Sequence, residues 1–261
     1  MKRCALALVV LASGCIGRSE AGALPESFDR PAQRGAVTSA AHRGQTTLSG
    51  RVTWPGARPP MEPLAVTGNF SACGTSVPFA ALEIGADQGV AGAVITVEGL
   101  RGRVPPTTVT IDQLGCSFSP HVVVVPVGSR LNLTNHDGLL HSVHAFRGER
   151  SEFNLATPTG MSVARPMTAP GLLRIQCEVG HTWMSGWVHV VDSPFVAVTD
   201  AHGAYSIPHL PPGTYRVTMW HEGWTARPSS NSRPAYGAPV SQTETVTIPA
   251  SGDVERSFTL Q

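Results

Sequence analysis

Short runs of alternating apolar and polar residues recur along most of the chain, and Gly- and Pro-rich turns separate them. Such alternation is typical of half-buried β-strands. We predict strands in the following runs between residues 47 and 192: TLSGRVTW, VAGAVITVEGL, TTVTIDQL, HVVVVPVGSRLNLTN (two strands joined by a Gly-Ser turn), GLLRIQCEV and GWVHVVD. Residues 147–170 are polar and Pro-rich, so we expect a loop with at most one short strand there. No long amphipathic helical pattern interrupts these runs, which predicts an all-β fold.

A second group of strand-like runs begins near Ser193. The segment SPFVAVTDAHGAYSIPHLPPGTYRVTMWHEGW predicts three strands joined by turns at DAHG and PPG. ETVTIPASGDVERSFTL adds two more strands. We therefore predict a first folded region over 47–192 and a separate small β-sandwich over 193–261.

Composition agrees with a turn-rich β protein that does not bind nucleic acid. Of the 261 residues, 27 are Gly and 22 are Pro, and only 14% are charged. The formal net charge is +1, and no dense basic run is present. Nucleic acid is therefore excluded as an expected partner.

The amino terminus has the features of an export signal. MKR supplies positive charge, ALALVVLA is a short apolar core, and LASGC ends at Cys15. LASGC resembles the lipobox of bacterial lipoproteins. The resemblance implies that 1–15 is a signal peptide and that Cys15 is lipidated. The protein would then be exported and anchored by lipid, either facing the periplasm or at the outer membrane, with ordinary secretion as the alternative.

The residues after Cys15 predict a spacer between the anchor and the folded body. Residues 16–46 lack sustained periodicity and are rich in small and polar residues. Such composition is typical of a flexible linker.

Three cysteines remain beyond the signal, and one of them stands out. In an oxidising compartment two of Cys73, Cys116 and Cys177 are expected to pair. Cys177 is the best candidate for a free thiol, because it alone has a His and a Met close behind it, in CEVGHTWM.

The spacing of Cys177, His181 and Met184 between two predicted strands suggests a soft-metal site. A type 1 copper site needs one thiolate, two imidazoles and a weak axial thioether. The loop supplies three of these donors. The second imidazole is expected from His141, which follows the strand that ends at Asn135.

These residues carry a resemblance to a known family. Asn135-x-Asp137-x3-His141-Ser142-Val143, taken with the Cys177 loop, resembles the cupredoxins, the blue-copper proteins that include plastocyanin and azurin. The resemblance implies a Greek-key β-sandwich that binds one type 1 copper ion through His141, Cys177, His181 and Met184. Asn135, Ser142 and Trp183 would lie next to the ligands, and Ser142 would tie the two ligand loops together.

The loop spacing refines this expectation. Cys-x3-His-x2-Met also matches the later half of the binuclear copper loop of cytochrome oxidase, but the second cysteine of that loop is replaced here by Leu173. One copper ion is therefore predicted. The chain further resembles bacterial exported proteins that join a cupredoxin to a carboxypeptidase regulatory-like domain, whose loops read Cys-x2-His-Pro-Trp-Met. Here Gly180 is extra and Thr182 replaces the proline.

The second resemblance implies a domain organisation. Residues 47–192 would be a cupredoxin-like copper domain with an N-terminal extension. Residues 193–261 would be a carboxypeptidase regulatory-like sandwich with a transthyretin-like or carbohydrate-binding-like fold. Cys73 and Cys116 are predicted to form a disulfide.

Other readings of the histidines and the metal stay open. Zinc is the rival metal, although a Met ligand argues for a softer ion. His144 is an alternative ligand close to His141, and His121 is expected to be structural or to lie just outside the ligands.

The expected function is one-electron transfer in the cell envelope with a redox partner protein, for example a cytochrome. The chain lacks the clustered His-x-His motifs of multicopper oxidases, a zinc peptidase motif and a nucleophile elbow, so no enzymatic activity is expected. One alternative is copper storage or delivery. The other is a surface carbohydrate-binding or adhesion module that uses Tyr215, Trp220 and Trp224 of the C-terminal sandwich.

Overall fold

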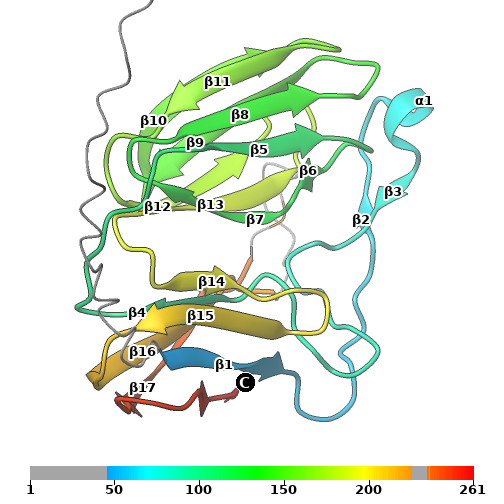
Figure 1. Ribbon diagram of the computed structural model, residues 1–261. Coiled ribbons are helices and arrows are strands. Elements are labelled where there is room, and N and C mark those ends of the chain that lie inside the picture. Colours follow the sequence, from blue (N-terminus) through cyan, green and yellow to red (C-terminus); the bar gives the residue numbers. More distant parts are fainter. Residues whose placement is uncertain (1–45, 225–233, 235) are drawn as a thin grey trace, which may run out of the picture. The chain divides into compact units, whose positions relative to one another are not determined.

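The computed structural model describes residues 46–224, 234 and 236–261, and within them nearly all regular structure is β (Figure 1). The all-β prediction is confirmed. The predicted signal peptide 1–15, its Cys15, and all of the predicted linker except residue 46 lie outside the described residues. Among the described residues, no helix has the length and apolar character needed to cross a membrane.

The first β-sandwich has two sheets whose apolar faces share one core. One sheet has the order β10-β9-β12-β13-β7, with β7 (Val122–Pro126), β9 (His141–Arg147), β10 (Arg150–Thr157), β12 (Gly171–Gln176) and β13 (Ser185–Val191). The other has the order β11-β8-β5-β6, with β5 (Thr108–Gln113), β6 (Phe118–Ser119), β8 (Arg130–Asn135) and β11 (Ser162–Pro166). Because side chains alternate between faces, one face of each sheet fills the core. Ile175 of β12 and Leu133 of β8 are both fully buried there.

The second β-sandwich is built in the same way around its own core. One sheet has the order β15-β1-β18, with β19 also paired to β1, and contains β1 (Thr46–Thr53), β15 (Ala204–Leu210), β18 (Val254–Glu255) and β19 (Phe258–Thr259). The other has the order β14-β4-β16-β17, with β4 (Val94–Val97), β14 (Val196–Val198), β16 (Gly213–His221) and β17 (Val240–Ile248). Leu48 of β1 and Met219 of β16 are fully buried in this core.

From residue 46 onward, the described chain therefore begins in the second sandwich, enters the first and then returns to the second. β1 pairs with β15, with Leu48 opposite Ile207, and β4 pairs with β16, with Ile95 opposite Met219. The predicted division into 47–192 and 193–261 thus cuts through both sheets of the second sandwich. Strand pairing needs no closeness in sequence, and the apolar faces of β1 and β4 require a core that only the later strands supply.

Two strands lie where the sequence predicted a loop with at most one short strand over 147–170, and that prediction is wrong. β10 pairs with β9 along its length, and β11 pairs with β8. Both are edge strands of their sheets. An edge strand buries few side chains, so its polar sequence resembles that of a loop.

Residues 64–77, which we term the strap, lie beside the first sandwich (Figure 1). The strap contains β2 (Leu64–Ala65), the short helix α1 (Phe70–Cys73) and β3 (Ser76–Val77), and β2 pairs with β3. A disulfide joins Cys73 to Cys116, in the turn between β5 and β6, which confirms the predicted pairing. Cys177 is the free cysteine among the described residues.

Candidate metal centre

Two turns of the first sandwich carry the predicted ligands. One turn connects β8 to β9 and ends at His141, and the other, between β12 and β13, carries Cys177, His181 and Met184. β9 pairs with β12, so the start of one strand lies beside the end of the other. All four side chains are at most 1% exposed. The fold therefore places these distant positions in one buried region.

Three donor atoms converge in this region. The Nδ1 atoms of His141 and His181 are 2.9 Å apart, and Cys177 Sγ lies 3.9 Å and 3.5 Å from them, respectively. A metal ion about 2.0–2.1 Å from each nitrogen and about 2.3 Å from the sulfur, in tetrahedral geometry, would space them about 3.3 to 3.6 Å apart. The three side chains thus stand close to the spacing that a single ion requires.

Met184 closes the loop that carries two of these donors. Its backbone N–H donates to the His181 carbonyl at 3.0 Å, and the Cys177 N–H donates to the Met184 carbonyl at 3.3 Å. The side chain is buried in the same core as Cys177. The loop is therefore a compact turn that carries Cys177, His181 and Met184.

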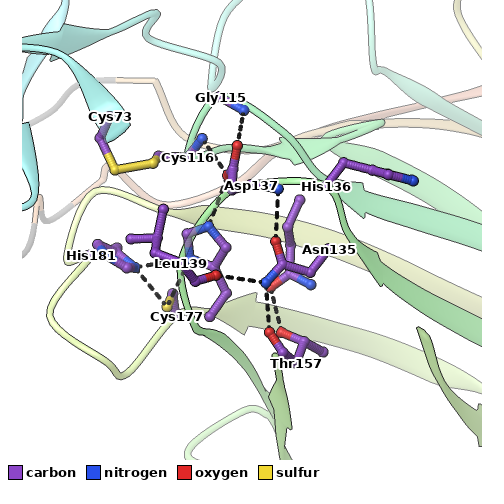
Figure 2. A network of polar contacts seen from close by, with 12 residues as sticks. Cys73, Gly115, Cys116, Asn135, His136, Asp137, Leu139, Thr157, Cys177 and His181 are labelled. Carbon is purple, nitrogen blue, oxygen red and sulfur yellow. Dashed lines mark hydrogen bonds and ion pairs between the residues drawn. A yellow bond between two sulfur atoms is a disulfide. The ribbon is translucent and has the colours of Figure 1, made fainter. Parts of the chain in front are cut away.

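Asp137 fixes the orientation of His141. The ring Nε2 donates to Asp137 Oδ2 at 2.8 Å, and the same carboxylate accepts the backbone N–H groups of Gly115 at 2.7 Å and Cys116 at 2.8 Å (Figure 2). A proton held on Nε2 leaves the Nδ1 lone pair free for a metal. Burial alone would lower the pKa of His141, but its bonds to Cys177 and Asp137 raise it. Asp137 belongs to the motif that resembles the cupredoxins, but nothing in the sequence indicated this role.

Asn135 shapes the turn that presents His141. Its amide nitrogen donates to the carbonyls of Leu139 at 2.9 Å and Thr157 at 2.6 Å, and its Oδ1 accepts the Asp137 N–H at 3.0 Å (Figure 2). These bonds satisfy backbone groups that the turn would otherwise bury unpaired.

The other two predicted neighbours, Ser142 and Trp183, also lie beside the predicted ligands. Ser142 Oγ accepts the Glu178 N–H at 2.9 Å and is 3.9 Å from Cys177 Sγ, so it links the two ligand turns. Trp183 is buried, donates its indole N–H to the Cys116 carbonyl at 3.0 Å, and lies 5.4 Å from the His181 ring, centroid to centroid.

One site residue was not predicted. Asn69 of the strap places its side-chain amide 2.9 Å from His181 Nε2. No local pattern marks Asn69. Its place four residues before Cys73, a predicted disulfide partner, is the one sequence feature near it.

The two alternative histidines lie outside the converging group. His144 pairs with Glu178 at 3.3 Å and with Ser151 at 2.8 Å. His121 pairs with the buried carboxylate of Glu222. Neither supplies an atom to the groups of close potential ligands found among the described residues.

The Cys177 thiol is acidic in the metal-free protein. Burial opposes its ionisation, but hydrogen bonds from His141 and His181 outweigh burial and lower the pKa of Cys177 from 9.0 to about 5. Between pH 5 and pH 9, Cys177 therefore carries a proton in the unfolded chain but not in the folded chain. The stabilising contribution of the thiolate is fully present above pH 9 and is lost as the pH falls towards 5.

This pKa can be tested on the metal-free chain. Thiolate ultraviolet absorbance should persist at neutral pH and disappear near pH 5, and Cys177→Ser should remove it. The free energy of unfolding in urea should be measured for wild type and for Cys177→Ser. The wild-type value minus the Cys177→Ser value should rise from pH 5 to pH 9. The raised pKa of His141 contributes in the opposite direction and depends in part on Cys177, so the thiolate absorbance is the primary measurement. Thiolate absorbance that disappears near pH 9 would contradict the prediction.

Comparison with known proteins gives matches among solved structures alone. No family model and no curated protein matches the chain. The solved structures include a copper-containing nitrite reductase from Thermus scotoductus SA-01, with 24% identity and a TM-score of 0.29, covering 36% of this chain and 24% of that one. They also include a purple cupredoxin from Nitrosopumilus maritimus, with 21% identity and a TM-score of 0.29, covering 31% of this chain and 98% of that one. Amicyanin from Paracoccus versutus has 21% identity and a TM-score of 0.29, covering 37% and 97%.

Proposed function

We propose that this protein binds one copper ion in a type 1 site and transfers single electrons. The observation that carries the proposal is the convergence of Cys177 Sγ with the Nδ1 atoms of His141 and His181. One thiolate with two imidazoles is the donor set of blue-copper sites. Met184 is proposed as the weak thioether ligand, and a thioether favours copper over zinc.

The closed site supports electron transfer over catalysis. The four proposed ligands are buried, whereas a catalytic metal keeps a position open for its substrate. A cavity of about 620 Å³ in the described part of the chain is lined by none of these four residues. When bound, copper would accept and release one electron, and the chain would hold its ligands in place and exclude water.

Exposed apolar side chains offer a docking surface for a redox partner. Five large apolar residues are exposed in the described part of the chain: Phe70, Leu114, Leu140, Met161 and Val179. Phe70 follows Asn69, and Leu114 precedes Gly115, whose N–H donates to Asp137. Leu140 precedes His141, Val179 lies between Cys177 and His181, and the Met161 carbonyl accepts the Asn135 N–H. Exposed apolar groups gathered in one region are typical of protein interfaces. We propose that a redox protein, such as a cytochrome, docks here.

The aromatic residues considered for sugar binding are engaged in packing. Trp220 lies 5.3 Å from Trp187 and 4.4 Å from His189, and Trp224 lies 5.5 Å from Trp54, all between ring centroids. Tyr215 bonds the Pro211 carbonyl at 3.2 Å. These contacts favour a structural role over stacking on carbohydrate.

Metal loading of the full chain tests the proposed function. We expect one copper per chain, an intense visible absorption towards the red, and reversible bleaching by a mild reductant. Paramagnetic spectra should show the small copper hyperfine splitting of a copper–thiolate site. Tight Cu(I) binding without a stable Cu(II) form would indicate copper delivery, and absence of copper binding would refute the proposal.

A further inference from the structure

We propose that Asn69 is a positioning residue for His181, one that holds the imidazole in place both with and without a bound metal. This inference rests on the proposed copper site, because it assigns His181 Nδ1 to the metal. It concerns a strap residue that lies 112 positions away from His181.

Asn69 contacts Nε2, the ring nitrogen of His181 that faces away from Cys177. Nδ1 of His181 lies 3.5 Å from Cys177 Sγ, and Nε2 lies 2.9 Å from Asn69 Nδ2. His181 is 1% exposed, and the exposed residue Asn69 supplies the polar partner of its Nε2. A buried ring nitrogen without a partner would cost about 1–3 kcal/mol. Asn69 therefore satisfies Nε2 and fixes the plane of the ring.

The chemistry of the amide suits both states of the ring. In the structure, Nε2 of His181 lies 2.9 Å from the Asn69 amide nitrogen, and its Nδ1 lies 2.9 Å from Nδ1 of His141 and 3.5 Å from Cys177 Sγ. A ring protonated on Nδ1 accepts at Nε2 from the Asn69 NH₂ group. When Nδ1 binds a metal, the neutral ring carries its proton on Nε2 and must donate there. The Asn69 carbonyl oxygen can accept that proton after the amide turns over, whereas a carboxylate could only accept.

The two histidines therefore have different kinds of partner. Asp137 accepts from His141 Nε2 and holds this ring in the tautomer that leaves Nδ1 free. Asn69 can donate to or accept from His181. Because Asn69 can take either role, His181 can stabilise the Cys177 thiolate before the metal binds and can bind the metal afterwards.

The strap is built to hold Asn69 at this position. Asn69 has φ of 57°, and its carbonyl accepts the N–H groups of Ala72 and Cys73, each at 3.0 Å. Cys73 is joined to Cys116, whose N–H donates to Asp137 (Figure 2). One disulfide thus connects the partner of His181 to the partner of His141.

Two substitutions of Asn69 and one control test the proposal. Asn69→Gly removes the amide and tolerates a positive φ, and Asn69→Asp keeps an acceptor but no donor. Ser71→Ala, at an exposed position in α1 two residues after Asn69, is the matched control. We expect Asn69→Gly to weaken Cu(II) binding about 10- to 100-fold, the usual cost of losing a partner just outside the ligands. Asn69→Asp should retain the affinity within a few-fold, and Ser71→Ala should match wild type.

A measurement on the metal-free protein keeps this test independent of copper. Nitrogen-15 spectra of the imidazoles should show His181 protonated on Nδ1 in wild type and in Ser71→Ala. They should show the proton moved to Nε2 in Asn69→Asp and shared between both nitrogens in Asn69→Gly. Wild-type chain that binds no copper would refute the proposed function, while these spectra would still test the Asn69 contact. If the wild type binds copper and Asn69→Gly matches it in both affinity and spectra, the inference is overturned.

Discussion

Replacing His141 by Gln is expected to abolish the proposed type 1 copper site, whereas replacing His144 by Gln should leave it intact. His141 supplies a fully buried Nδ1 beside Cys177 Sγ, and no other described imidazole is placed to take over. His144 lies on the same strand but pairs with Glu178 and Ser151. Loss of a ligand should exceed the cost of losing a residue just outside the ligands, so Cu(II) affinity should fall more than about 100-fold.

Titration with Cu(II) and the visible spectrum measure this difference. The His141→Gln chain should show no intense absorption towards the red, and the His144→Gln chain should match wild type in intensity and stoichiometry. Urea unfolding of both variants separates loss of the site from loss of the fold. Equal weakening by the two substitutions would contradict the assignment of His141, and loss with His144→Gln alone would reverse it.

Replacing both Cys73 and Cys116 by Ala is expected to lower the free energy of unfolding by about 4 kcal/mol, from the loop-closure entropy of their 43-residue separation. Without the cross-link the unfolded chain gains freedom. Val66 and Val77 of the strap stay buried in the core of the first sandwich, so the expected loss comes from the unfolded chain. Urea unfolding of the oxidised wild type and of the double variant measures the change.

Ser71→Ala is the control for this substitution, since it alters α1 without breaking the cross-link and should change stability by less than about 0.5 kcal/mol. If the double variant loses less than about 1 kcal/mol, the entropic account of the disulfide is wrong. Reduction of the wild-type protein should expose two more free thiols, those of Cys73 and Cys116.

The sequence alone was enough to predict the local features of the candidate site. The apolar alternation of β8 stops at Asn135, and that of β12 stops just before Cys177, so both ligand turns could be located. Cys177, His181 and Met184 lie within eight positions, and chain connectivity alone keeps such donors close together. The pairing of Cys73 with Cys116 followed because Cys177 had a reason to remain a thiol.

Only the tertiary structure decided what surrounds those residues. Asn69 reaches His181 across 112 positions, and Asp137 accepts N–H groups from a turn more than 20 residues away. Such contacts leave no periodicity in the sequence, because they depend on which sheet edges and turns the packing brings together. For the same reason, the membership of β1 and β4 in the second sandwich could not be predicted from sequence order. A strand's own pattern shows that one of its faces must be buried, but the partner that buries it is chosen by the whole fold.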